Sequence, residues 1–294
     1  MHHKFLRGAA TVAIIGGTVT FGLGSTQTAV ASPTPPTFVP CGTSLSTAIS
    51  DADTGAVLVL APGCTYWLTE TGLPMINKTL TIVGHDSSIT RSYADDTPSF
   101  TIFSVCYGGN LTLDNVNVRN GDGNDNGGAI SNVNGIVTIN GGTFSDNHAA
   151  DYGGAIYSDD GTGTVTINGA TFKGNGASAE GGAIYNDAGA TVTIHGTTFI
   201  DNHATDNGGA IYNDSNLTAT HARFALNAAD HGGGVYNDDG GTISLTGGLI
   251  MFNRAFEADG GGGVYNGDGG AATLTGVILM FNTPDNCVGT ITGC

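Results

Sequence analysis

The sequence predicts an all-β protein, a single-stranded right-handed parallel β-helix of about nine coils with a short N-terminal capping helix. Three observations predict this fold. A Gly-Gly-Ala-Ile or Gly-Gly-Gly-Val motif recurs at intervals of 24 to 29 residues. A large apolar residue stands three positions before an asparagine in each interval, and short β-favouring runs lie between, with no long helical segment to cover a sheet. The motifs open at Gly127, Gly153, Gly181, Gly208, Gly232 and Gly261.

Residues 1–31 resemble an export signal. Lys4 and Arg7 precede an apolar run from Gly8 to about Gly24, and Ala29-Val30-Ala31 fits a small-residue cleavage site. An uncleaved anchor helix is the alternative, but the run is short for a membrane span and rich in Gly and Thr. We expect cleavage, a mature chain that starts near Ser32 without a membrane span, and a secreted, extracellular or cell-surface location.

The region after the signal is expected to cap the β-helix. Residues 32–44 form a Pro-rich leader, and the β-helix domain is expected to run from 45 to 294. Apolar residues from Leu45 to Ala52 have helical spacing, with Ser44 or Thr43 available as the N-cap. A short amphipathic helix here would cover the apolar side chains and strand edges that the first coil exposes.

We divide the β-helix domain into N-terminal coils at 54–120, the repeats at 121–283, and a C-terminal closure at 284–294 that a disulfide completes. Five cysteines in an exported chain favour disulfide bonds. Local bridges are expected at the two ends, Cys41 with Cys64 and Cys287 with Cys294. Cys106 then remains as a free thiol, expected to be buried among apolar neighbours.

Each repeat is expected to hold three short strands, with equivalent residues stacked in columns from coil to coil. Val and Ile of the Thr-Val-Thr-Ile strand face the core together with the phenylalanine column of Phe144, Phe172, Phe199 and Phe224. Tyrosines that follow the inward Ile or Val are expected to stack along an outer face. The asparagines of the second motif should form an amide ladder that satisfies turn backbone groups. This asparagine ladder consists of Asn147, Asn175, Asn202, Asn227, Asn253 and Asn282.

The alternation of Gly-Gly-Ala-Ile with Phe-x-x-Asn resembles the chlamydial polymorphic outer-membrane protein repeat, within the pectate-lyase-like right-handed β-helix superfamily. The resemblance covers Leu111 to about Asn282, and the segment from Cys41 to Arg91 resembles the first coils of exported bacterial β-helix proteins. What the family implies is surface display and adhesion. We therefore expect a non-enzymatic adhesion, binding or structural module that recognises a glycan or a surface.

A carbohydrate-active enzyme of the superfamily, a polysaccharide lyase or glycoside hydrolase, is the alternative. Those enzymes require a Lys or Arg base with calcium-binding carboxylates, or two to three close Asp residues. Six basic residues remain after the signal, and we find no cluster among them; no catalytic residue is therefore assigned. These are Lys78, Arg91, Arg119, Lys173, Arg223 and Arg254.

Charge limits the classes of partner. The chain carries 25 acidic and eight basic residues, a formal net charge of −17. Nucleic acid is not expected as a partner, because phosphate recognition requires a basic surface. No cofactor is expected, although calcium is possible: Asp122, Asn124 and Asn126 match the first half of a calcium loop, whereas Val133 stands where its bidentate acid should be. A plain polar turn is the alternative.

One outer face is the candidate binding surface. Outward residues of the second strand form a grid of short polar groups, spaced about 4.8 Å between coils and about 6.6 Å along a strand. Such a grid could dock an extended polysaccharide or a cell-surface ligand, with the tyrosines as stacking surfaces. Threonine is also simply a favoured exposed strand residue. The face consists of Thr164, Thr166, Thr191, Thr193, Thr218, Thr242 and Ser244, with Tyr185, Tyr212 and Tyr236.

Overall fold

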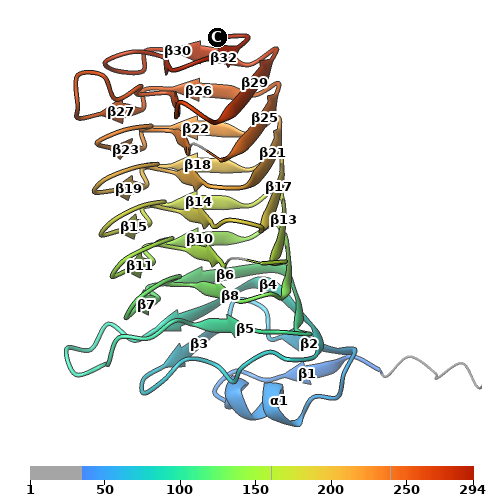
Figure 1. Cartoon of the computed structure of the whole chain (residues 1–294). Coiled ribbons are helices and arrows are strands. Elements are labelled where there is room, and N and C mark those ends of the chain that lie inside the picture. Colours follow the sequence, from blue (N-terminus) through green and yellow to red (C-terminus); the bar gives the residue numbers. More distant parts are fainter. Residues whose placement is uncertain (1–34, 160, 239) are drawn as a thin grey trace, which may run out of the picture. The chain divides into compact units, whose positions relative to one another are not determined.

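The computed structural model describes residues 35–294, with 160 and 239 excepted, and the predicted signal segment lies outside this range. The described chain is a right-handed parallel β-solenoid of about nine turns with one short helix, as the sequence predicted (Figure 1). Every strand pairing that joins successive coils is parallel, and residues 19 to 31 positions apart lie side by side.

Three sheets run along the stack. The 18-stranded sheet contributes two strands to most coils. Its strands are β1 (Thr37–Val39), β2 (Ala56–Leu60), β3 (Thr65–Leu68), β4 (Thr79–Arg91), β6 (Asn110–Arg119), β9 (Ile136–Asn140), β10 (Thr143–Ser145), β13 (Thr164–Asn168), β14 (Thr171–Lys173), β17 (Thr191–His195), β18 (Thr198–Ile200), β21 (Asn216–Thr220), β22 (Arg223–Ala225), β25 (Thr242–Thr246), β26 (Leu249–Met251), β29 (Ala271–Thr275), β30 (Ile278–Met280) and β32 (Ile291–Thr292).

The other two sheets consist of short strands. The eight-stranded sheet holds β5 (Phe103–Val105), β8 (Ile130–Asn132), β12 (Ile156–Ser158), β16 (Ile184–Asn186), β20 (Ile211–Asn213), β24 (Val235–Asn237), β28 (Val264–Asn266) and β31 (Cys287–Val288). The six-stranded sheet holds β7 (Asp122–Gly123), β11 (His148–Ala149), β15 (Gly176–Ala177), β19 (His203–Ala204), β23 (Ala228–Ala229) and β27 (Arg254–Ala255). This third sheet was not predicted, because two-residue strands have no recognisable period.

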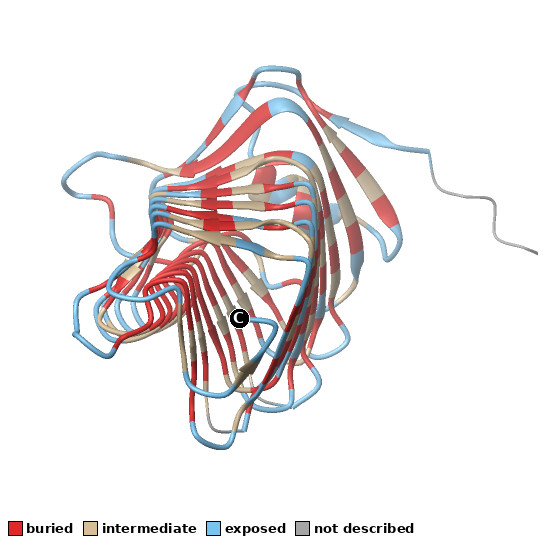
Figure 2. Cartoon of the chain, turned by 90° about the horizontal axis from the view of Figure 1, so that it is seen from above, coloured by how far each residue is buried: buried red, intermediate tan, exposed pale blue. Residues whose placement is uncertain are grey.

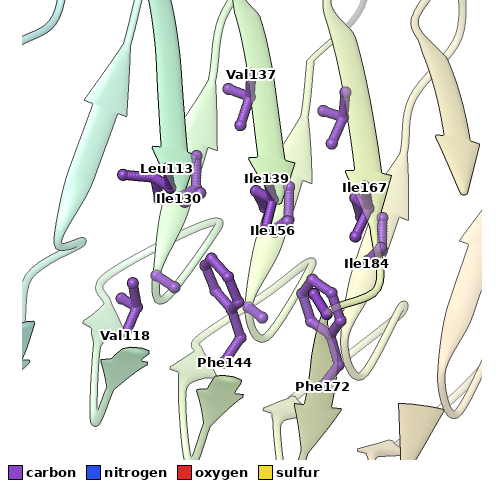
Figure 3. Close-up of a cluster of buried hydrophobic side chains, with 14 of the residues drawn as sticks. Leu113, Val118, Ile130, Val137, Ile139, Phe144, Ile156, Ile167, Phe172 and Ile184 are labelled. Atoms are coloured by element: carbon purple, nitrogen blue, oxygen red, sulfur yellow. The ribbon is translucent and has the colours of Figure 1, made fainter. Parts of the chain in front are cut away.

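The core lies inside the coils, where side chains of one kind stack on their equivalents. Val165 pairs with Val192 and Ile167 with Ile194. Phe144, Phe172, Phe199 and Phe224 stack face to face with ring centroids 4.9 to 5.0 Å apart, and each is at most 1% exposed. Figure 3 shows two of these rings beside the aliphatic columns, and Figure 2 shows buried residues alternating with exposed ones along the coils. The predicted core columns are confirmed.

The asparagine ladder lies buried at the turn before the six-stranded sheet. Asn175 donates its Nδ2 to Asn202 Oδ1 at 2.9 Å and to the Phe144 carbonyl at 3.0 Å, and its backbone N–H donates to the same Oδ1 at 3.1 Å. The other members repeat this pattern up to Asn282, which donates to Asn286 Oδ1 at 2.8 Å. The ladder therefore satisfies turn groups that water cannot reach, as the sequence predicted.

A second asparagine ladder, which the sequence analysis missed, runs along the end of the eight-stranded sheet. Asn186, Asn213 and Asn237 each donate Nδ2 to the Oδ1 of the next member at 2.7 Å. Ser158 interrupts this ladder, since it occupies the position between Asn132 and Asn186. The recurring Ile-Tyr-Asn triplet was the available signal.

The N-terminal end is capped by α1 (Leu45–Asp51), as predicted. Ser44 is the N-cap and accepts a hydrogen bond from the Thr47 N–H at 3.2 Å, while Leu45 and Ile49 are buried against the first coil. Lys78 Nζ donates to the Ile49 carbonyl at 2.7 Å at the other end of the helix. Part of the predicted leader, β1, pairs in parallel with β2.

Both predicted disulfides are present, Cys41–Cys64 at the N-terminal end and Cys287–Cys294 at the C-terminal end. Cys106 is the free cysteine among the described residues. Its predicted burial is wrong in part: the residue is only half-buried, because it follows the inward Val105 at the end of β5 and begins a turn.

Candidate functional site

A continuous column of hydroxyl side chains crosses the outer face of the 18-stranded sheet. Each member pairs in register with the next, and all are half-buried or exposed. We call this set the Thr column. It consists of Thr81, Thr112, Thr138, Thr166, Thr193, Thr218, Ser244, Thr273 and Thr292.

The remaining threonines of the predicted face lie beside this column. Thr164 pairs with Thr191, and Asn216 separates Thr191 from Thr242 in the same row. The row on the other side of the Thr column is polar as well, and its His195 Nδ1 lies 2.6 Å from Thr220 Oγ1. The structure thus brings all seven predicted hydroxyl residues onto one face.

The predicted tyrosines form a second column, on the outer side of the eight-stranded sheet. We call Tyr157, Tyr185, Tyr212, Tyr236 and Tyr265 the Tyr column. Neighbouring ring centroids are 4.7 to 5.6 Å apart, and the rings from Tyr185 onward lie within 7° of parallel. The rings therefore cover each other's faces.

The Tyr column is less accessible than the sequence predicted. Tyr185 and Tyr236 are half-buried, and Tyr212 is buried with 6% of its surface exposed. Two side chains that directly precede Gly-Gly motifs pack against the column: the Tyr152 ring centroid lies 4.8 Å from that of Tyr185, and the His231 ring centroid lies 5.5 Å from that of Tyr265. The predicted stacking of Tyr185, Tyr212 and Tyr236 along an outer face is present, whereas their use as stacking surfaces for a ligand stays a prediction.

Carboxylates line the edge of the Tyr column. The Tyr157 hydroxyl donates to Asp187 Oδ2 at 2.8 Å and lies 3.0 Å from Asp159 Oδ1, and the Tyr212 hydroxyl donates to Asp238 Oδ2 at 2.6 Å. Burial, together with these carboxylates, raises the pKa of Tyr157 and Tyr212. Burial also raises the pKa of the Asp214 carboxyl, to which Asp238 and then Asp187 add. The tyrosines stay protonated donors.

A pocket of about 520 Å³ opens at the N-terminal end of the Tyr column. Tyr157 and Asp159 form one wall, and Ser131 and Ser104 lie beneath. The lining is completed by Thr71, Gly72, Leu73, Phe100, Thr101, Asn124, Asp125, Asn126 and Val133. This pocket was not predicted from the sequence.

The three predicted calcium ligands have separate partners. Asp122 accepts from Ser99 Oγ and lies 3.5 Å from Arg91 Nη2, while Asn124 Nδ2 donates to the Ser99 carbonyl at 3.2 Å. Asn126 Oδ1 accepts from the Tyr152 N–H at 3.3 Å. The Asp122 carboxylate and Asn126 Oδ1, which are oxygen atoms that a calcium ion would require as ligands, are therefore already engaged in these contacts. Calcium binding by this loop remains a prediction.

Charged side chains are sparsely paired in the described part of the chain. Asp122 bonds to Arg91 and to His148, and His231 lies 3.9 Å from Asp259. Within the same residues, no group of three His, Cys, Asp or Glu is arranged to hold a metal ion. No lysine or arginine in those ion pairs meets two carboxylates.

An exposed apolar row at the C-terminal coils was also not anticipated. Leu226, Phe252 and Phe281 directly precede asparagines of the ladder, have φ between 56° and 60°, and are 46 to 67% exposed. Asp146 and Asp201 occupy the same turn position in earlier coils with similar φ. Bulky residues rarely adopt this left-handed conformation, so the row carries backbone strain.

Comparison with known families matches the repeats. The model of the Chlamydia polymorphic membrane protein repeat matches residues 141–159, 169–187 and 196–214. Three segments of the chain therefore carry this repeat. Each matched segment begins at or near the turn before the Phe strand and ends just after the Ile-Tyr-Ser or Ile-Tyr-Asn strand that follows, so it includes one member of the asparagine ladder.

A solved structure of a mutant of the PL6 family alginate lyase AlyGC is similar to the chain at 19% identity, with a TM-score of 0.43. The similarity covers 88% of this chain and 39% of the lyase, so the chain spans well under half of that protein. The comparison with curated proteins found no match. Among the described residues, no helix is long and apolar enough to cross a membrane.

Proposed function

We propose that this chain is an exported, non-enzymatic binding module that holds an extended neutral glycan along the Thr column. The observation that carries the proposal is the length of the column: nine successive hydroxyl positions in unbroken register. Each hydroxyl can both donate and accept, which matches the hydroxyl groups of a sugar chain. A polymer can contact several coils at once and so add many weak bonds.

Charge supports a neutral ligand. The chain has a formal net charge of −17, which repels acidic polymers at long range. The Thr column itself contains no charged residue, so its contacts should depend little on salt.

The repeat supports a location outside the cell. Segments that match a polymorphic membrane protein repeat, two disulfides and the predicted export signal all favour a surface-displayed or secreted chain. Adhesion to a glycan-bearing surface is the role that fits this location.

An array of neutral and acidic glycans, read together with mass spectrometry of the incubated ligands, tests the proposal. We expect retention of neutral polymers with no shortening. The triple variant Thr166→Val, Thr193→Val and Thr218→Val should lose retention, because valine keeps the shape and β preference of threonine but lacks the hydroxyl. The matched control with serine at the same positions should keep it. Shortened ligand would instead support the alternative, a polysaccharide lyase or glycoside hydrolase.

A further inference from the structure

The Tyr column ends at the pocket, because Tyr157, its last member toward the N-terminus, lines it. Tyr157 pairs in register with Ser131, and Ser131 pairs with Ser104. Serine thus occupies two successive positions at which the following five coils carry tyrosine. Two such positions span about 10 Å along the stack at about 4.8 Å a coil.

The pocket lies where Ser131 and Ser104 stand in place of tyrosine rings. Ser104, Ser131, Tyr157 and Asp159 all contribute to its lining, and its volume is about 520 Å³, within the range of small-molecule sites. The loop at Thr71 and the loop at Asn124 to Asn126 close its sides. The space is therefore an open depression lined by several segments of the chain.

Tyr157 presents an aromatic face to this space. Its ring stacks on Tyr185 on the C-terminal side, with centroids 5.6 Å apart, and the N-terminal side has Ser131 in place of a ring. The hydrogen bond from its hydroxyl to Asp187, with Asp159 Oδ1 3.0 Å from the same oxygen, fixes the ring orientation. A fixed aromatic face at the end of a stack is a ready platform for another flat ring.

The polar lining selects the chemistry of that ring. Thr71, Thr101, Ser104, Ser131, Asn124 and Asn126 supply neutral polar groups, and Asp125 and Asp159 add two carboxylates that can accept hydrogen bonds from hydroxyl groups. No basic side chain lines the pocket, which disfavours phosphate or carboxylate ligands. A cation would use acceptors alone and leave the donors unused. A sugar ring, with an apolar face and a rim of hydroxyl groups, uses the whole lining.

We propose that this pocket binds one or two neutral sugar residues, stacked on the free face of Tyr157 in the place of the missing tyrosines. The site is separate from the Thr column and rests on the proposed function only in sharing its ligand class. It would hold a chain end or a short oligosaccharide.

A column-completing variant tests the site. Ser131→Tyr should place a ring one coil from Tyr157, at the separation at which the other tyrosines stack. Maltose, cellobiose, laminaribiose, mannobiose and chitobiose serve as probes in saturation-transfer NMR and calorimetry with the full chain. We expect at least one disaccharide to bind, with Kd raised tenfold or more in Ser131→Tyr. The control Ser131→Ala keeps the space and should change Kd less than threefold.

A second pair of variants keeps the test valid if Ser131→Tyr does not fold. Tyr157→Leu removes the aromatic face and should weaken binding tenfold or more, whereas Tyr157→Phe keeps the face and should retain most of it. Binding of no disaccharide, or equal binding by Ser131→Tyr in its folded state, would overturn the site. Tetramethylammonium binding in place of sugar binding would overturn it as well.

The valine triple variant of the Thr column separates the two proposals. Disaccharide binding that persists in that variant supports the pocket whether or not polymer binding is lost. If polymer binding depends on the Thr column and no disaccharide binds, the pocket proposal is wrong and the proposal for the Thr column stands.

Discussion

The interruption of the second asparagine ladder makes Ser158→Asn the most informative stability variant. Within the described residues, three buried side-chain atoms have no hydrogen-bond partner, namely Asn132 Oδ1, Ser158 Oγ and Asn186 Oδ1. All three lie at this interruption. An asparagine at 158 would donate Nδ2 to Asn186 Oδ1, as Asn186 does to Asn213, and would accept from Asn132 Nδ2.

The size of the effect follows from these atoms. Ser158→Asn removes one unpaired hydroxyl and pairs one orphaned acceptor, while Asn132 Oδ1 stays unpaired. A buried unpaired polar group costs about 1–3 kcal/mol, and a new hydrogen bond adds about 0.5–1.5 kcal/mol net. Room exists, because Gly163 faces Ser158 as Gly241 faces Asn237. We expect a gain of about 2 kcal/mol, or about 4–8 °C in Tm for a chain of this size.

Differential scanning calorimetry and urea unfolding measure this gain. Asn213→Ser is the matched reverse variant: it places the same interruption in an intact part of the ladder and should lower the free energy of unfolding by a similar amount. Ser158→Ala removes the hydroxyl but leaves Asn186 Oδ1 unpaired, and it should recover only part of the gain. A folded Ser158→Asn variant with unchanged or lower stability would refute the reasoning.

Three further predictions concern other columns. Leu226→Asn should raise the free energy of unfolding by about 1 kcal/mol, because asparagine tolerates the left-handed backbone conformation better than leucine does. Asp201→Leu, at the same turn position in an earlier coil, should lower the free energy of unfolding by a similar amount. Changes of the opposite sign in urea titrations would contradict this. Asn202→Ala should lower the free energy of unfolding by about 3 kcal/mol or more, because Asn202 forms hydrogen bonds with both neighbouring members of the asparagine ladder. A decrease of less than about 1 kcal/mol in urea titrations would contradict a stabilising role of the ladder. The raised pKa of Asp214 means that the folded state holds its proton more tightly than the unfolded state, so stability should increase as the pH falls from 7 toward 4. Asp214→Asn should therefore stabilise the chain at pH 7 and make its Tm depend less on pH. An unaltered pH profile of Tm in this variant would argue against crowding of Asp214 by Asp238 and Asp187.

Columns inside the coil could be predicted because their residues carry a clear period. Phe172 and Asn175 are three positions apart in one coil and recur in the next with the same spacing, so stacking of like on like follows from the parallel register. In the Thr-Val-Thr-Ile strand, the outward direction of the threonines and the inward direction of valine and isoleucine follow from the alternation of side chains along a β-strand. The helical spacing of apolar residues from Leu45 predicted α1 with Ser44 or Thr43 as its N-cap, and the structure has Ser44 in that place.

The Tyr column shows where sequence reasoning fell short. Alternation correctly directs Tyr185 outward from its strand, but it cannot reveal that the Tyr152 ring packs against it from a turn. The pocket required a comparison between coils: Ala-Ile-Ser-Asn at Ser131 differs from Ala-Ile-Tyr-Asn at Tyr185 by one ring. Its side walls come from loops with no periodic pattern, and only the folded chain brings those loops together.

Recognition of a neutral glycan by the hydroxyl groups of the Thr column is the central claim. Affinity electrophoresis of the full chain through gels that contain a neutral polysaccharide, at 0.05 M and at 0.5 M salt, tests it most directly. We predict retardation that is equal at both salt concentrations, lost in the triple valine variant at 166, 193 and 218, and kept in the triple serine variant. Retardation that survives in the valine variant, or that disappears at high salt, would contradict the claim.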